Sequence, residues 1–201
     1  MVKEINEKYK AILIFGAPGA GKGTQAKLIS NDKRYFHFST GEMFRNLKHD
    51  KEMKDTGIAK KVNELISGGN FVPDNMTIEL FFKTLEQYQK QNKYNPNEQI
   101  LILDGIPRNT TQVDLIKNKI DVTKIIYLYA SKENSLLERL IKRAIVEKRD
   151  DDKAEVIKKR LEIYKKDTEA VIGKYSPKII LKIDALPKIE KVYQEILKQL
   201  K

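Results

Sequence analysis

Short apolar runs alternate along this chain with longer stretches in which apolar residues recur at every third or fourth position. A continuous apolar run is typical of a strand buried on both faces, and the longer spacing is typical of an amphipathic helix. The pattern predicts five strands, at 11–15, 35–38, 100–103, 124–129 and 178–183. Because strands that alternate with helices pair in parallel, we predict an α/β fold with a parallel sheet flanked by helices.

Polar residues precede three of the predicted helices and are candidate N-caps, since their side-chain oxygens can accept hydrogen bonds from the first helical turn. The candidates are Asp74 before 75–90, Thr110 or Thr111 before 112–119, and Ser131 before 132–144. A final helix is predicted from about Pro187 to Leu200.

The most informative segment is the glycine-rich run from Gly16 to Thr24, which directly follows the first predicted strand. A turn of this kind wraps backbone N–H groups around a polyphosphate, and Lys22 adds a mobile positive charge. The usual P-loop has Ser or Thr immediately after the lysine, as a ligand of Mg²⁺. Here Gly23 occupies that position and Thr24 follows. This departure favours a kinase of small molecules over a GTPase or a motor ATPase.

Two further features gather at the same edge of the predicted sheet. Ligands of parallel sheets bind beyond the carboxyl ends of the strands, where both the glycine-rich run and the segment 104–108 lie. Two segments look like insertions over this edge, a helical one at about 40–72 and a highly charged one at about 143–151. We expect them to act as mobile covers.

The composition is that of one domain with a proper core, since 40% of its 201 residues are hydrophobic. The absence of cysteine excludes disulfides and thiolate metal sites. The first six residues contain no signal-type apolar run, and no run reaches the length that spans a membrane. We therefore expect a cytoplasmic protein without a membrane partner.

The net charge of +11 raises the possibility of a nucleic-acid partner. The lysines are mixed with acidic residues along the predicted helices, as at 155–162, which is typical of solvated helix faces. We therefore do not expect nucleic acid to be the main partner.

Arginine is rarer than lysine in this chain, and its planar guanidinium suits phosphate oxygens better than an ammonium does. The seven arginines are Arg34, Arg45, Arg108, Arg139, Arg143, Arg149 and Arg160.

Six segments of the chain together match the motifs of a known family in their order. They are 16–24, 37–45, 71–74, 103–108, 138–143, and Arg149 to Asp152 leading to 159–161. With these segments the chain resembles the nucleoside monophosphate kinases over nearly its whole length, and within them the adenylate kinases with a short lid.

The resemblance implies reversible transfer of the terminal phosphoryl group from MgATP to AMP, which gives two ADP and serves adenine nucleotide homeostasis. It implies a P-loop NTPase fold, with a five-stranded parallel sheet, in a single kinase domain over 1–201. We also expect a monomer. The core would comprise 1–39, 73–142 and 152–201, with a monophosphate-binding insertion at about 40–72 and a short lid at about 143–151.

The resemblance also assigns site residues. The ATP site would comprise Gly19, Ala20, Gly21, Lys22, Gly23, Thr24, Arg139 and Arg143. The AMP site would comprise Thr40, Arg45, Gly69, Phe71, Val72, Gly105, Arg108, Gln112, Arg149 and Arg160. Arg45 and Arg108 would hold the AMP phosphate, and Gln112 would read the adenine edge with a paired donor and acceptor.

The catalytic groups implied are basic side chains that stabilise the transferring phosphoryl group. They are Lys22, Arg108, Arg139, Arg143, Arg149 and Arg160. Asp104 would hold Mg²⁺, the cofactor that accompanies ATP, through water. The lid is too short for a zinc site, and none is expected.

Other interpretations stay open at this point. The short lid is also a feature of UMP/CMP kinases, although Gln112 at the adenine-reading position and the lack of an asparagine-rich sequence after Arg108 favour AMP. A nucleotide- or RNA-binding P-loop regulator would account for the net charge of +11. Among single residues, Asp104 could cap a helix or form a turn, Gln112 could be a solvated first-turn residue, and His37 is expected to pack rather than react.

Overall fold

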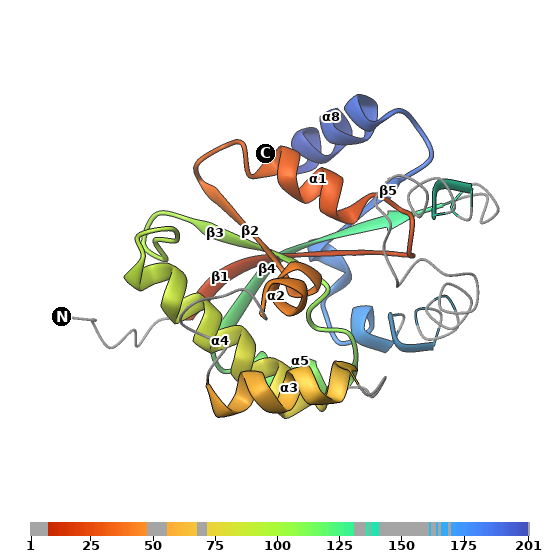
Figure 1. Ribbon diagram of the computed structural model, residues 1–201. Helices are drawn as coiled ribbons and strands as arrows, with labels where there is room; N and C mark the ends of the chain where they lie inside the picture. Colours follow the sequence, from red (N-terminus) through yellow and green to blue (C-terminus); the bar gives the residue numbers. More distant parts are fainter. Residues whose placement is uncertain are drawn as a thin grey trace.

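A sheet of five parallel strands forms the centre of the molecule (Figure 1). The computed structural model describes residues 8–47, 56–67, 72–130, 136, 138–140, 161, 164, 166–168 and 170–200. The strands are β1 (Tyr9–Gly16), β2 (Tyr35–Ser39), β3 (Ile100–Asp104), β4 (Ile120–Tyr129) and β5 (Ile180–Asp184). Their order across the sheet is β2-β3-β1-β4-β5, so β1 is hydrogen-bonded on both sides.

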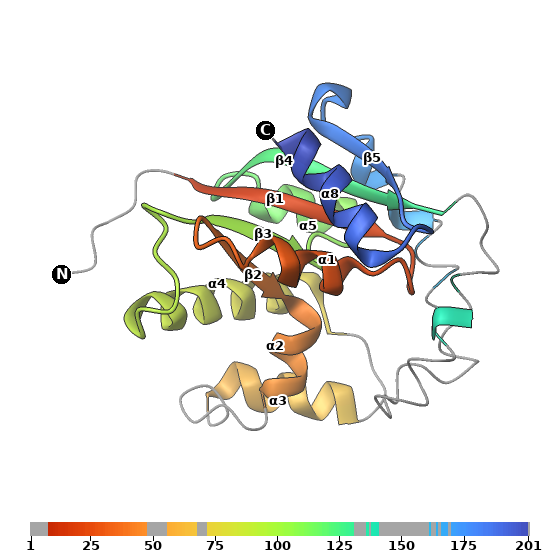
Figure 2. The same cartoon turned by 90° about the horizontal axis from the view of Figure 1, so that it is seen from above.

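Helices cover both faces of this sheet. They are α1 (Lys22–Ile29), α2 (Thr40–Asn46), α3 (Gly57–Ser67), α4 (Asp74–Lys90), α5 (Thr110–Ile116) and α8 (Ile189–Leu200), with a short 3-10 helix η2 (Pro177–Ile179) before β5. Helices α1 and α8 pack together on one face, and α4 and α5 pack together on the other (Figure 1). Figure 2 shows α2 leaving the end of β2 and leading away from the sheet toward α3.

The central strand explains how the sheet separates two hydrophobic cores. Successive side chains of a strand point to opposite faces. Ala11, Leu13 and Phe15 accordingly lie in the core shared with α4 and α5, whereas Ile12 and Ile14 lie in the core under α1 and α8. All five are buried, which is why β1 is a continuous apolar run.

The predicted strands and the α/β class are confirmed, with small differences at the strand ends. The largest difference is at β4, which begins at Ile120 rather than 124. Its first residues alternate between apolar and polar, as in Asp121 and Thr123, so the continuous apolar run underestimates its length. The last helix begins at Ile189, two residues after the predicted start.

Two of the predicted N-caps are wrong. Asp74 is the first residue of α4 rather than its cap, which is Pro73. The cap of α5 is Asn109, not Thr110 or Thr111, because its side chain accepts a hydrogen bond from the backbone of Gln112 at 2.9 Å. Asn ranks above Thr as a capping residue, so the sequence contained the signal. Ser131 and most of the helix predicted to follow it lie outside the described residues.

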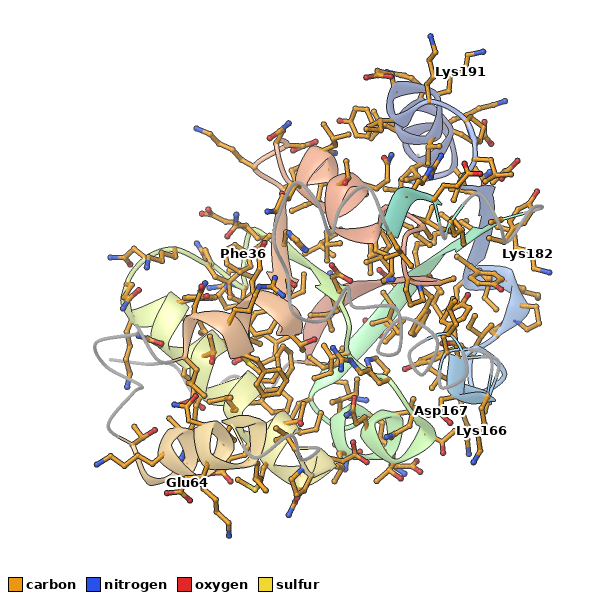
Figure 3. The ribbon with its side chains drawn as sticks, turned by 45° about the vertical axis from the view of Figure 1, so that its right-hand side comes forward. Phe36, Glu64, Lys166, Asp167, Lys182 and Lys191 are labelled. Carbon is orange, nitrogen blue, oxygen red and sulfur yellow. The ribbon has the colours of Figure 1, made fainter. Side chains whose placement is uncertain are left out.

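Exposed charges are spread over separate elements of the surface. Glu64 on α3, Lys182 on β5 and Lys191 on α8 lie on different outer parts of the molecule (Figure 3). This distribution is consistent with general solvation of the surface. None of the helices in the described part of the chain is long and apolar enough to cross a membrane.

The core under α4 depends on a pair of aromatic rings. The ring centroids of Phe38 on β2 and Phe81 on α4 are 4.8 Å apart with an interplanar angle of 86°, an edge-to-face contact, and Phe81 is completely buried. We expect Phe81→Ala to lower the free energy of unfolding by about 3–5 kcal/mol, because it removes the ring and leaves a cavity. Urea denaturation followed by circular dichroism measures this difference.

The matched control is Leu115→Ala on α5, where the side chain is 43% exposed. We expect a change within about 0.5 kcal/mol there. A similar loss from both substitutions would contradict the assignment of Phe81 to the core.

Candidate active site

The turn between β1 and α1 is shaped by glycines at positions that other residues could not occupy without strain. Gly19 has a φ of +86°, and a Cβ there would lie 2.6 Å from the carbonyl oxygen of Leu136. Gly21, with a φ of +83°, is the N-cap of α1, and no side chain caps this helix end. The partial positive charge of this helix N-terminus favours an anion beside it.

Lys22 lies back across this turn. Its Nζ donates to the carbonyl oxygens of Gly16 at 2.7 Å and Ala17 at 3.2 Å. The ammonium is thus held against the backbone at the start of the loop. A polyphosphate placed on the loop would meet both the backbone N–H groups and this charge.

Asp104 is the last residue of β3 and lies directly beside the loop. It is paired in register with Ile14 on β1 and with Ser39 on β2. A Cβ on Gly23 would lie 3.4 Å from Asp104 Oδ2, an ordinary contact distance. The glycine-rich run and the segment 104–108, both predicted at the carboxyl edge of the sheet, are therefore adjacent there.

The electrostatic surroundings of Asp104 favour its ionised form. Burial alone would raise the pKa of this carboxyl group. The neighbouring His37 and the positive charges of Lys22 and Arg108 lower the pKa by more than burial raises it, so it lies below its usual value. His37 Nε2 lies 3.7 Å from Asp104 Oδ2, and the histidine side chain is 8% exposed. A partly exposed carboxylate beside a phosphate loop fits the oxygen ligands that Mg²⁺ prefers.

Thr40 connects the start of α2 to the end of β3. Its side chain is buried, and its Oγ1 lies 3.0 Å from the carbonyl oxygen of Gly105 and 3.3 Å from that of Asp104. Gly105 has a φ of +85° and approaches Thr40 so closely that a Cβ would lie 2.5 Å from Oγ1. Thr40 and Gly105 were both predicted to line the AMP site, and the structure places them in contact.

Two exposed arginines flank this contact. Arg45 folds back over the start of α2, so that a Cβ on Gly41 would lie 3.1 Å from its Nη1. Arg108 Nε donates to the carbonyl oxygen of Gly105 at 3.0 Å. Both guanidinium groups therefore lie close to the backbone at the carboxyl ends of β2 and β3.

Gln112 is buried, with 4% of the residue exposed, and both ends of its side-chain amide are hydrogen-bonded. Its Oε1 accepts from the backbone N–H of Arg108 at 2.8 Å, and its Nε2 donates to Asp74 Oδ1 at 2.6 Å. It is therefore not the solvated first-turn residue that the sequence left open. The sequence reasoning missed Asp74 and Asn109 as its partners.

Arg139 has a partner that the sequence did not predict. Its Nη1 donates to the carbonyl oxygen of Ala185 at 2.7 Å and its Nη2 to that of Leu186 at 2.9 Å. Both acceptors lie just after β5. The guanidinium thus joins the segment 138–140 to the end of the last strand, and its contact with a phosphate stays a prediction.

Several predicted site residues lie outside the part of the chain that the structure describes. They are Gly69, Phe71, Arg143, Arg149 and Arg160, together with the predicted lid at 143–151. Val72, the described end of the 69–72 stretch, packs against the core shared with α4 and α5.

Comparison with known proteins identifies the class of this site. The adenylate kinase family model matches residues 14–180, which include the glycine-rich turn, β3 and the start of β5. The adenylate kinase of Azobacteroides pseudotrichonymphae is 34% identical over 193 residues, covering 93% of this chain and 95% of the relative. That of Thermus thermophilus is 30% identical over 192 residues, with 93% and 95% covered. That of Prochlorococcus marinus strain MIT 9515 is 38% identical over 171 residues, with 83% and 84% covered.

A parallel sheet with a glycine-rich phosphate loop after its central strand defines a P-loop protein. The extent of these matches places the chain more narrowly: it belongs to the adenylate kinase family.

The contact between Gly105 and Thr40 provides a test of the site's geometry. We expect Gly105→Ala to lower the free energy of unfolding by at least about 1–2 kcal/mol, because alanine is strained at a left-handed φ and its Cβ would clash with Thr40. Chemical denaturation measures the loss. Gly57→Ala at the start of α3 is the control, since a Cβ there meets nothing within 4 Å. We expect no loss there, and equal losses at the two glycines would contradict the assigned geometry.

Proposed function

We propose that this protein transfers the terminal phosphoryl group of MgATP to AMP and releases two ADP, reversibly. The observation that supports this most directly is the meeting of two anion-binding arrangements at one edge of the sheet. Asp104 is paired with β1, which leads into the loop and Lys22, and with β2, which leads into Thr40 and its contact with Gly105 beside the two arginines. Membership of the adenylate kinase family agrees with it.

On the donor side, the backbone N–H groups over 19–24 and the ammonium of Lys22 would bind the ATP phosphates. Phosphoryl transfer needs little covalent chemistry from the protein, and it depends on holding two anionic substrates in line while charge is neutralised. Lys22 would supply that charge from a position it already holds, because its Nζ reaches back across the loop to Gly16 and Ala17. Arg139 and Arg143 are proposed to assist at the same substrate.

On the acceptor side, Arg45 and Arg108 would bind the AMP phosphate. Guanidinium groups form paired hydrogen bonds with phosphate oxygens. Arg45 on α2 follows β2, and Arg108 follows the neighbouring strand β3. We propose that Gln112 reads the adenine edge and that Thr40, Gly105 and the stretch 69–72 line the base pocket. Arg149 and Arg160 are proposed to close on the transferring group.

Asp104 would hold the Mg²⁺ that accompanies ATP, through bound water. Bound there, the ion would neutralise charge on the phosphates. The contribution of the chain is a carboxyl group with a lowered pKa beside Gly23, which stays ionised at neutral pH. Gly23 has no hydroxyl side chain that could bind the ion. This fits a site in which the ligand of the ion is Asp104 at the end of β3 rather than a residue of the loop.

Adenine is the proposed acceptor base, since the relatives named above are all adenylate kinases. UMP/CMP phosphorylation has no observation in its favour beyond the short stretch between Arg143 and Arg149. An RNA-binding regulator would rest on net charge alone. From the sequence we also propose a cytoplasmic location and a monomeric state.

A coupled assay with AMP, dAMP, GMP, UMP and CMP tests the acceptor. We expect kcat/KM for AMP to exceed that for every other ribonucleotide in this set, because the amide of Gln112 offers a donor beside an acceptor to the base. A higher kcat/KM for UMP or CMP would refute the adenine assignment. Tight RNA binding with a steep salt dependence and little turnover would instead support the regulator.

The proposed role of Arg108 is tested by Arg108→Ala. We expect kcat with AMP to fall roughly 10²-fold or more, because a preorganised positive charge is lost from the transition state. The control is Arg34→Ala, since Arg34 is exposed and its Nη2 pairs with Asp32 at 2.6 Å, away from the candidate site. Equal decreases in kcat for the Arg34 and Arg108 variants, measured by steady-state kinetics, would contradict a specific role of Arg108 at the site.

A further inference from the structure

We propose that Asp74 determines the acceptor base by holding the side-chain amide of Gln112 in one orientation. Asp74 is the first residue of α4, and Gln112 lies in the first turn of α5. Asp74 Oδ1 accepts from Gln112 Nε2 at 2.6 Å. The inference rests on the proposed recognition of adenine by Gln112. It adds that Asp74 sets the orientation of the amide that recognises the base.

The two partners of the Gln112 amide have fixed and opposite chemistry. The backbone N–H of Arg108 can only donate, and it meets Oε1 at 2.8 Å. The carboxylate of Asp74 can only accept, and it meets Nε2. A flipped amide would set a donor against the N–H and an acceptor against the carboxylate. At 4% exposure of Gln112, water cannot readily compensate for either mismatch.

Asn109 holds the carboxylate in place. Its Nδ2 donates to Asp74 at 3.1 Å from Oδ1 and 3.0 Å from Oδ2, while its Oδ1 caps the backbone N–H of Gln112. The first turn of α4 also favours a negative charge, because unpaired N–H groups give a helix N-terminus a partial positive charge. Asp74 is therefore fixed relative to both the backbone and the side chain of Gln112.

The amide keeps hydrogen-bonding capacity for a base after these contacts are made. A glutamine amide has two N–H donors and two acceptor lone pairs, and Asp74 and Arg108 occupy one of each. Among contacts with the described residues, one donor and one acceptor remain, in an order that Asp74 and the backbone N–H of Arg108 fix together. Adenine presents an amino donor at N6 beside an acceptor at N1, whereas hypoxanthine presents an acceptor at O6 beside a donor at N1. The two purines are nearly the same size, so the order of donor and acceptor is what separates them.

Asp74→Asn tests this inference with almost no change in shape. An asparagine amide can donate or accept, so it can pair with either orientation of Gln112, and only the backbone N–H of Arg108 still disfavours the flipped amide. We expect the ratio of dissociation constants for IMP and AMP, measured by titration calorimetry, to fall by roughly tenfold or more, the effect of one mismatched hydrogen bond. An unchanged ratio in the folded variant overturns the proposal.

Asp114→Asn is the matched control. Asp114 lies on the same helix as Gln112, and its Oδ1 pairs with Lys117 Nζ at 3.2 Å on the exposed side. The same chemical change there should leave the ratio as in the unmodified protein. An equal fall in both variants would mean that loss of charge near α5, not orientation of the amide, changes selectivity, and it would overturn the proposal.

Gln112→Leu separates this inference from the proposed function. If AMP affinity is unchanged in that variant, or if the unmodified protein does not bind AMP, the reading of adenine by Gln112 fails. If AMP affinity falls in Gln112→Leu but the ratio in Asp74→Asn is unchanged, only the orienting role of Asp74 fails.

A measurement on the unmodified protein keeps the proposal testable if Asp74→Asn does not fold. The side-chain amide protons of Gln112, observed by NMR with ¹⁵N labelling, should exchange with solvent more slowly than those of Gln194, which is exposed on α8. Exchange as fast as that of Gln194 would show that the amide is not held, and it would overturn the proposal.

Discussion

Parallel pairing of β1 with β3 on one side and β4 on the other is the constraint on which the candidate site depends. Parallel strands end at a common edge, so the residues that follow them meet there whatever their separation in the sequence. The register that pairs Ile14 and Ser39 with Asp104 brings the phosphate loop, β3 and the start of α2 together. Because β1 is hydrogen-bonded on both sides and buried on both faces, the loop extends from a strand that is restrained on every side.

Charge at this edge is arranged around one carboxylate. Asp104 is largely buried, yet its pKa lies below the usual value because His37 lies beside it and because the charges of Lys22 and Arg108 approach it from different elements. The same two basic groups are proposed to bind donor and acceptor phosphates. A single acidic side chain therefore separates two groups of positive charge that would otherwise repel one another across a low-dielectric site.

The strands and the glycine-rich turn could be predicted from the sequence because each depends on neighbouring residues. A buried parallel strand needs a continuous apolar run, and a left-handed turn needs glycine, as at Gly19. The partners of Gln112 could not be predicted, because Asp74 lies 38 positions away and only the packing of α4 on α5 brings them together. The contact of Arg139 with the carbonyl oxygens after β5 likewise depends on tertiary structure. Sequence spacing identified the residue types of the site, and the fold determines which atoms meet.

The position of Lys22 has a consequence for the entropy of ligand binding. A free lysine side chain samples many rotamers, and a ligand that immobilises it must offset that loss of freedom, on the order of 1.5–2 kcal/mol. Here the two carbonyl contacts restrain the side chain before any ligand arrives. Part of the ordering is then already present in the folded chain, so an incoming phosphate exchanges one set of oxygen partners for another with a smaller loss of freedom.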